Sequence, residues 1–369
     1  MSKRLLLLGG IAILCVVLHH AGGRGQVAMF LWTDQYRPVT VPNWDQIGTL
    51  PYYVLLVIKS GVVIGVPAFL FISGFFVAYT ARSGKAGPSW NIVWARIKVL
   101  LVPYLIWSGV TFALDAFLGT TYQPAEYLFR LFSTGAGGGL WYVPLLCYFY
   151  LLSPFLVPLA KARPRLFLSS MALIQLGAMG LRYLQSFAGE IPGLDLMLRL
   201  TPEWSVTRWI FFFSLGIFAC LHTRELKQWL APRRWALLAA AGTLYLLNLV
   251  ESERILRLTQ ATWFAGLDTL SFNLCAVACL LCFLAFEQAR IPYSQRLSRL
   301  GMRSFGIYIL HALIIEIASR GIRVVLPLFL AHPLLFTALL VVFGLGGSLL
   351  LMEAVARSPA RKAYRYFFG

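Results

Sequence analysis

Two adjacent histidines, His19 and His20, close the first apolar run of the chain, at 5–18. An ionisable side chain inside a bilayer is costly and is usually functional. Histidine also changes its charge closer to neutral pH than other side chains, so it can take up and return a proton during a reaction. The pair therefore predicts proton-transfer chemistry at the outer end of a membrane helix.

A second polar group lies near the end of the chain. Ser304, Tyr308 and His311 fall at i, i+4 and i+7, which places them on one face of a helix. This face fits either a polar site or hydrogen bonding between packed helices. Glu316 follows His311 by five residues, about 140° around the helix, and is a poor direct partner for it.

Further ionisable residues lie within or beside the apolar segments. Exposure of such residues to lipid is costly, so each should face the bundle interior or water. With alternating topology, all except His311 fall in the outer half, and they predict a polar cavity opening outward. Lys59 and Arg208 can equally be packing partners or interfacial anchors. The set is His20, Lys59, Asp115, Arg182, Arg208, Asp268, His311 and Glu316.

The elements that position these residues are apolar helices. Hydrophobic residues make up 59% of the chain and charged residues 12%, which excludes an ordinary soluble protein. We predict an all-α integral membrane bundle of about ten transmembrane helices, forming a single domain over 1–369 with no separate soluble domain. The second helix can begin earlier than 60, because 51–58 is apolar too. The predicted spans are 5–20, 60–80, 97–118, 139–158, 166–187, 205–222, 235–251, 264–286, 304–319 and 333–356.

The distribution of charge predicts the orientation of the bundle. With the N-terminus inside, 21 of 32 Lys and Arg but only 3 of 14 Asp and Glu lie on the inner side, a net +18. The outer side then has a net charge of zero. The positive-inside rule favours N-in and C-in. Contact with anionic lipids accounts for this inner charge, so we predict no nucleic-acid partner.

The longest outer loop, 21–59, contains Asn43, Trp44 and Asp45. A polar, aromatic loop of this length can act as a lid over an acceptor site. It can equally pack over the end of the bundle, and the sequence leaves both interpretations open.

Several segments, taken in order, resemble the motifs of acyltransferase family 3. Members of this family are membrane-bound acyltransferases with ten-helix domains that acylate sugars and other envelope molecules. The first helix, up to His20, resembles the family's opening motif of an arginine, ten residues and a histidine. The other segments are 67–75 with its F-x-S-G-F pattern, the basic start of the third helix at Arg96, the fourth-helix start Leu140-Trp141-Tyr142-Val143, and the S-x-x-x-Y-x-x-H pattern at 304–311.

The chain departs from the family pattern at one position. Gly9 stands where the family has its arginine, eleven residues before His20. Arg4 is about 160° around the helix from His20, so sliding the alignment does not supply the missing charge. We expect Arg96, Lys98 or another inner basic residue to replace it. A different donor or a loss of activity is the alternative.

The resemblance implies an enzyme, an acyltransferase that transfers groups other than aminoacyl groups. It would move acetyl or another short acyl group from acyl-CoA to a hydroxyl of a sugar, glycolipid or envelope polymer. His20 would act as general base or carry the acyl group itself, with Asp115 or Asp268 orienting a histidine. The expected catalytic residues are His20, His19, Tyr308 and His311, with Tyr308, Ser304 or His311 supplying hydrogen bonds to a developing oxyanion. The expected donor-binding residues are Arg96, Lys98, Ser73, Trp141 and Tyr142.

The expected partners follow from the same resemblance. They are acyl-CoA as cosubstrate, a sugar or glycolipid acceptor, and membrane lipids, in a multi-pass protein of a prokaryotic plasma membrane. We predict no permanently bound cofactor and no metal site, because the six cysteines lie in apolar segments and suit helix packing. The alternatives are a transporter or flippase for a lipid-linked or anionic solute, or a non-catalytic relative. No inverted repeat is visible, which argues against transport.

Overall fold

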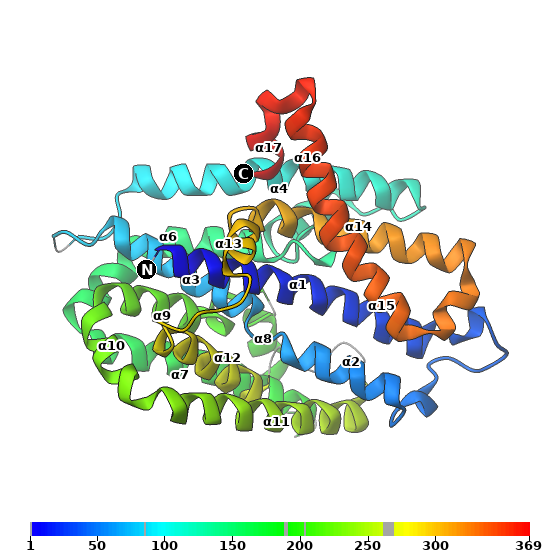
Figure 1. The fold of residues 1–369 in the computed structure, drawn as a ribbon, viewed down its shortest axis with the longest axis horizontal. Coiled ribbons are helices and arrows are strands. Elements are labelled where there is room, and N and C mark those ends of the chain that lie inside the picture. Colours follow the sequence, from blue (N-terminus) through cyan, green and yellow to red (C-terminus); the bar gives the residue numbers. More distant parts are fainter. Residues whose placement is uncertain (1, 85, 188–190, 203, 261–268) are drawn as a thin grey trace.

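The structure, a computed structural model, describes residues 2–84, 86–187, 191–202, 204–260 and 269–369. Within these ranges the chain forms helices and no β-strand, and many of the longer helices run along the long axis of the molecule (Figure 1). The predicted all-α membrane bundle is therefore confirmed. Among the described residues, eight helical segments are long and apolar enough to cross a membrane, and two further apolar helices, Ile210–Leu221 and Leu270–Ala285, are shorter. The count of ten spans and the N-in orientation remain predictions.

The long helical segments combine the following elements. They are α1 (Ser2–Leu31), α2 (Leu50–Gly61) with α3 (Gly65–Thr80), α4 (Trp90–Phe117), α6 (Tyr142–Ala162), α7 (Pro164–Phe187), α10 (Thr223–Leu230) with α11 (Arg234–Thr259), α14 (Ser304–Val325), and α15 (Pro333–Val342) with α16 (Ser348–Arg357). The shorter apolar helices are α9 (Ile210–Leu221) and α12 (Leu270–Ala285). The remaining short helices, which the sequence analysis did not predict, are α5 (Pro124–Phe132), α8 (Leu194–Leu200), α13 (Ser294–Met302) and α17 (Tyr364–Phe368).

The first helix is much longer than its apolar run. Because α1 continues to Leu31, the prediction that the histidine pair closes this helix was wrong, and the pair lies inside it. The extension is rich in glycine, which has low helix propensity. The extension packs closely against α15, and this packing favours glycine there. A Cβ on Gly25 would lie 2.1 Å from Oγ1 of Thr337 on α15. Tertiary contact thus selects glycine where propensity alone predicts a loop.

Two other spans are interrupted helices. The second span begins at Leu50, as the apolar 51–58 segment allowed, but breaks between α2 and α3. The last span contains one π-helical stretch, Phe343–Gly347, between α15 and α16. Beyond it, α16 and α17 carry the C-terminus and pack against α14 and α4 (Figure 1).

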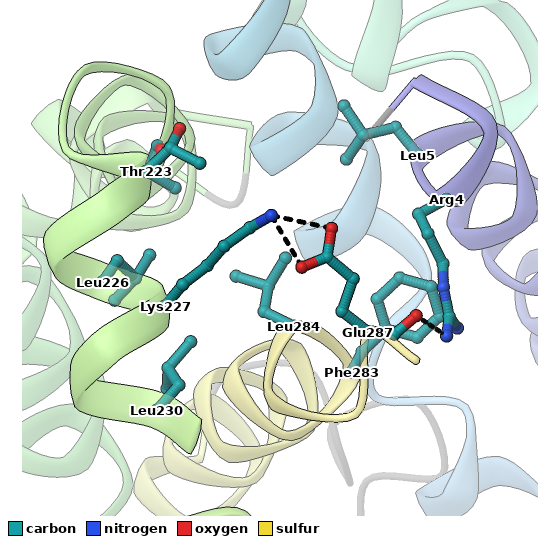
Figure 2. Close-up of a pocket in the computed structure, with 10 residues that line it drawn as sticks. Arg4, Leu5, Thr223, Leu226, Lys227, Leu230, Phe283, Leu284 and Glu287 are labelled. Carbon is teal, nitrogen blue, oxygen red and sulfur yellow. Dashed lines mark hydrogen bonds and ion pairs between the residues drawn. The ribbon is translucent and has the colours of Figure 1, made fainter. Parts of the chain in front are cut away.

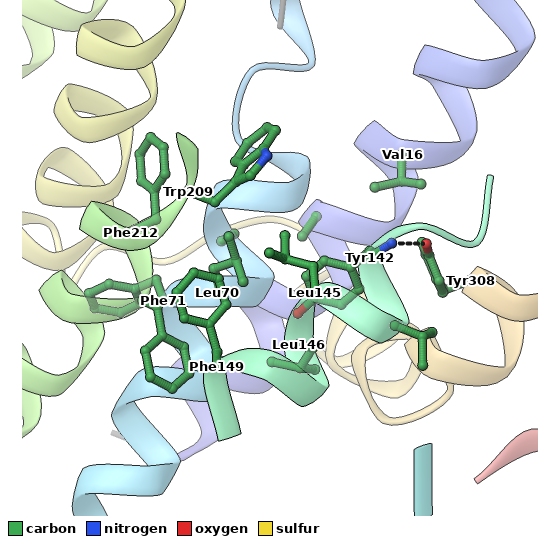
Figure 3. Close-up of a cluster of buried hydrophobic side chains, with 14 of the residues drawn as sticks. Val16, Leu70, Phe71, Tyr142, Leu145, Leu146, Phe149, Trp209, Phe212 and Tyr308 are labelled. Carbon is green, nitrogen blue, oxygen red and sulfur yellow. Dashed lines mark hydrogen bonds between the residues drawn. The ribbon is translucent and has the colours of Figure 1, made fainter. Parts of the chain in front are cut away.

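The main core lies where α1, α3, α6, α9 and α14 meet. Aromatic side chains fill it (Figure 3), and the rings of Phe149 and Phe213 stack with centroids 4.7 Å apart. Small residues bring α3 and α9 close together, as in many membrane helix pairs. A Cβ on Gly74 would lie 2.0 Å from the carbonyl oxygen of Phe213. This crossing fixes the position of α3, which carries one of the predicted donor-binding residues.

The loop between α1 and α2 packs over the end of α1. The backbone N–H of Asn43 donates to the carbonyl of Phe30 at 2.7 Å, and Asn43 is buried. The ring of Trp44 lies 5.1 Å from that of Phe30. These contacts support the packing interpretation of this loop rather than a lid.

Candidate active site

Three histidines from two helices gather in the interior of the bundle. The rings of His20 on α1 and His311 on α14 lie with centroids 4.9 Å apart and planes at 67°. The ring of His19 is 5.6 Å from that of His20. The structure therefore joins the two histidine motifs that the sequence placed far apart along the chain.

The environment of His311 fixes which of its nitrogens can act as a base. His311 is fully buried, and its Nδ1 lies 2.7 Å from the carbonyl oxygen of Tyr308 and 3.2 Å from that of Ile307. A carbonyl oxygen can only accept, so Nδ1 carries the hydrogen. The Nε2 lone pair then remains available, and this atom has no hydrogen-bond partner among the described residues. His311 is thus oriented by its own helix backbone.

The hydroxyl of Tyr308 both donates and accepts a hydrogen bond within the protein. It donates to the carbonyl of Gly139 at 2.6 Å and accepts the backbone N–H of Tyr142 at 3.3 Å (Figure 3). Its hydroxyl hydrogen therefore serves the loop before α6. In this arrangement it is not aimed at a substrate oxyanion, which was one of the roles expected for it.

A glycine-rich loop forms one wall of the histidine cluster. The run Gly135-Ala136-Gly137-Gly138-Gly139 links α5 to α6. A Cβ built on Gly139 would lie 3.9 Å from Cε1 of His20 and only 2.5 Å from the Cβ of Ala312. The sequence analysis missed this wall, although four glycines in five residues directly before Leu140-Trp141 were the available signal.

Three of the expected donor-binding residues form a connected line. Arg96 on α4 donates to the carbonyl of Phe76 at 3.2 Å and lies over the ring of Tyr150 at 5.6 Å. Ser73 on α3 is within hydrogen-bonding reach of both Tyr150 and Tyr142 on α6. Since Tyr142 contacts Tyr308, this line leads from Arg96 to the histidines.

The other two expected donor-binding residues lie outside this line. The side chain of Lys98 on α4 is exposed. Trp141 packs against Trp209, with ring centroids 5.3 Å apart. The structure therefore does not bring either side chain to the histidine cluster.

The expected carboxylate partner of a histidine is engaged elsewhere. Asp115 accepts from the hydroxyl of Tyr122 at 3.1 Å, and Asp268 lies outside the described residues. Lys59, buried on α2, donates to Oε1 of Gln26 at 2.9 Å. For His311, backbone carbonyls take the orienting role that sequence reasoning gave to an aspartate.

An ion pair joins α1 and α14 beyond the histidines. Arg24, one turn after His20, pairs with Glu316, and the same carboxylate also binds Nε of Arg320 at 2.5 Å. Sequence geometry had correctly made Glu316 a poor partner for His311. Its actual partner, Arg24, lay in a segment predicted to be a loop.

The structure shows the surroundings of Gly9, which stands where the family has its arginine. The short helix α13 crosses α1 here, and a Cβ on Gly9 would lie 3.7 Å from Cα of Gly301. The neighbouring Gly10 is tighter still, since its Cβ would meet the carbonyl oxygen of Leu297 at 1.9 Å. In this chain the face of α1 that includes Gly9 is a helix-packing surface.

A pocket lies at the N-terminal end of α1, between α1, α9, α10 and α12 (Figure 2). Its walls are mainly apolar, and its charged groups are already bonded. Lys227 pairs with Glu287 at 2.6 Å, and Arg4 donates to backbone carbonyls at the end of α12, among them that of Phe286 at 2.9 Å. None of the predicted site residues lines this pocket.

A comparison with protein families identifies the family of the chain. The model of a family described as an acyltransferase domain matches residues 6–353 of 369. The match confirms the resemblance that the ordered motifs indicated. No curated protein and no solved structure matches. The chain therefore belongs to acyltransferase family 3 and is a multi-pass membrane enzyme that transfers acyl groups other than aminoacyl groups.

Proposed function

We propose that this enzyme transfers acetyl or another short acyl group from acyl-CoA to a hydroxyl of a sugar, glycolipid or envelope polymer. It would act in a prokaryotic plasma membrane, with the donor approaching from the basic inner side and the acceptor from the outer side. The observation that carries the proposal is the pairing of His20 with His311 inside the bundle of a family acyltransferase.

The donor side rests on charge and on the line of polar side chains. With the predicted N-in orientation, the inner side carries a net charge of +18, which would attract the phosphates of a nucleotide thioester. Arg96 would bind the donor at the start of this line, and Ser73 and Tyr142 would guide the acyl-bearing arm toward Tyr308. Lys98 and Trp141 are weaker candidates, because neither reaches the line.

In the proposed reaction, the oxygen of the acceptor hydroxyl attacks the thioester carbonyl carbon while His20 accepts the proton of that hydroxyl. The carbon–oxygen bond forms, the carbon–sulfur bond breaks, and the proton passes from His20 to the departing thiolate. His311 lies beside His20 and its Nε2 has no hydrogen-bond partner among the described residues, so Nε2 would accept a hydrogen bond from the imidazolium formed on His20. Transfer through an acyl-histidine would use the same residues, with His20 as nucleophile.

The proposal is tested by comparing masses of envelope glycans and lipids with and without the protein. A shift by one acyl unit identifies both the acyl group and the acceptor. His20→Ala should abolish the shift at equal membrane abundance, whereas the exposed His332→Ala should retain it. Full activity of His20→Ala would exclude the role of His20. Counterflow of a solute without transfer from labelled acyl-CoA would support transport instead.

A further inference from the structure

The ion pair between Arg24 and Glu316 lies one helical turn beyond the histidine pair on the same two helices. Arg24 follows His20 by four residues, which places it on the same face of α1 and about 6 Å further along the axis. Its charge is close enough to act on His20. The family motifs that carry the proposed function include neither Arg24 nor Glu316.

The pair is accessible, although it is not fully exposed. The side chains of Arg24 and Glu316 are 34% and 21% exposed. Arg320, whose side chain is more exposed, forms an ion pair with the other oxygen of the Glu316 carboxylate. The donor line from Arg96 reaches the histidines through Tyr142 and Tyr308. The pair lies on the other side of His20, toward the C-terminal ends of α1 and α14.

The chemistry of the pair suits neighbouring hydroxyl groups. A guanidinium offers several N–H donors in a fixed fork, and a carboxylate offers acceptors only. Each sugar hydroxyl both donates and accepts, so two adjacent hydroxyls can bind the pair at once. A single alcohol satisfies only part of this arrangement.

We propose that Arg24 and Glu316 form an acceptor subsite that binds a vicinal diol of a sugar and presents a neighbouring hydroxyl to His20. This inference rests on the proposed acyl transfer, and it specifies the acceptor as a polyol. It treats Arg24 and Glu316 as binding residues, and the proton transfer stays with the histidines.

The test uses the full chain in a detergent without hydroxyl groups, acetyl-CoA as donor, and two acceptor probes, octyl glucoside and 1-octanol. The wild type should acetylate the glucoside in preference to octanol. Glu316→Gln should raise the apparent KM for the glucoside on the order of tenfold or more, with little change for octanol or for the donor KM. Arg320→Gln, which alters the same carboxylate from outside, is the matched control and should leave the glucoside KM near the wild-type value.

A second variant separates binding from bracing of the two helices. Exchanging the charges in Arg24→Glu/Glu316→Arg restores an ion pair. If the pair only braces the helices, thermal stability and the glucoside KM should both return. If it forms the subsite, stability should return while the KM stays high, because the donor and acceptor positions are exchanged.

Three results overturn the subsite: equal use of both probes, an unchanged glucoside KM in Glu316→Gln, or recovery of that KM in the exchanged variant. A preparation that acylates native envelopes but not the glucoside also overturns it, and leaves the proposed function intact. Absence of any transfer from acyl-CoA, in envelopes and with both probes, refutes the proposed function and the subsite with it.

Discussion

The substitution Gly139→Ala probes the wall of the histidine cluster with one methyl group. The backbone of Gly139 has φ −99° and ψ −12°, a conformation that alanine adopts without strain. The added Cβ would, however, lie 2.5 Å from the Cβ of Ala312, where ordinary contact begins at 3.4 Å. We therefore expect the loop to move away from α14 by about 0.9 Å, the difference between those distances.

This movement would act on the histidine cluster through Tyr308. The hydrogen bond from Tyr308 to the carbonyl of Gly139, now 2.6 Å, would lengthen to about 3.5 Å and lose most of its strength. Leaving these buried groups unsatisfied costs about 1–3 kcal/mol. Because a misplacement of about 1 Å can reduce a rate about 100-fold, acyl transfer should fall far more than membrane abundance.

The assay measures transfer from labelled acyl-CoA together with the thermal midpoint of the purified protein. Gly180→Ala on α7 is the control, because nothing lies within 4 Å of a Cβ there and alanine favours a helix by up to about 1 kcal/mol. In Gly139→Ala/Ala312→Gly the clashing methyl group is removed, so activity should recover. Full activity of the single variant, or no recovery in the double variant, would refute the reasoning.

Two further substitutions test the packing and the polar contacts around the site. Gly10→Ala should lower the thermal midpoint, because its Cβ would lie 1.9 Å from the carbonyl oxygen of Leu297. Such overpacking lowers the free energy of unfolding by about 1–3 kcal/mol. Gly9→Ala, with its nearest neighbour at 3.7 Å, should be tolerated, and equal midpoints for the two would contradict the close crossing of α1 and α13. Tyr308→Phe removes the donor to the loop and the acceptor for the N–H of Tyr142, so transfer should fall about tenfold or more at wild-type abundance. An unchanged transfer rate would mean that these two bonds do not position the site.

The class of the fold was predictable because lipid imposes it. Long apolar segments must become helices in a membrane, since every backbone polar group needs an internal partner. The same reasoning failed where packing decides the outcome. Helix α1 continues through Gly25, where α15 approaches closely, and hydropathy carries no information about such a contact.

The residues of the candidate site could be proposed from the sequence, whereas most of their contacts could not. The motifs singled out His20, Tyr308 and His311, and the structure brings these three together. The partners of His311 were not predictable, because they are backbone carbonyls of its own helix. Nor was the ion pair at Glu316, because Arg24 belonged to a stretch that propensity predicts to be a loop.

The glycine that departs from the family pattern is best understood through α13. An arginine at position 9 would have to place its long side chain between α1 and α13, where Gly301 and Ile72 are already in contact distance of a Cβ. At the neighbouring Gly10 a Cβ would lie 1.9 Å from the carbonyl oxygen of Leu297, so α13 packs tightly against α1 beside position 9. We therefore assign the basic contact in the proposed donor site to another helix. Arg96 is the residue that we propose for this contact, because the polar side chains beside it lead through α3 and α6 to Tyr308 and the histidine pair.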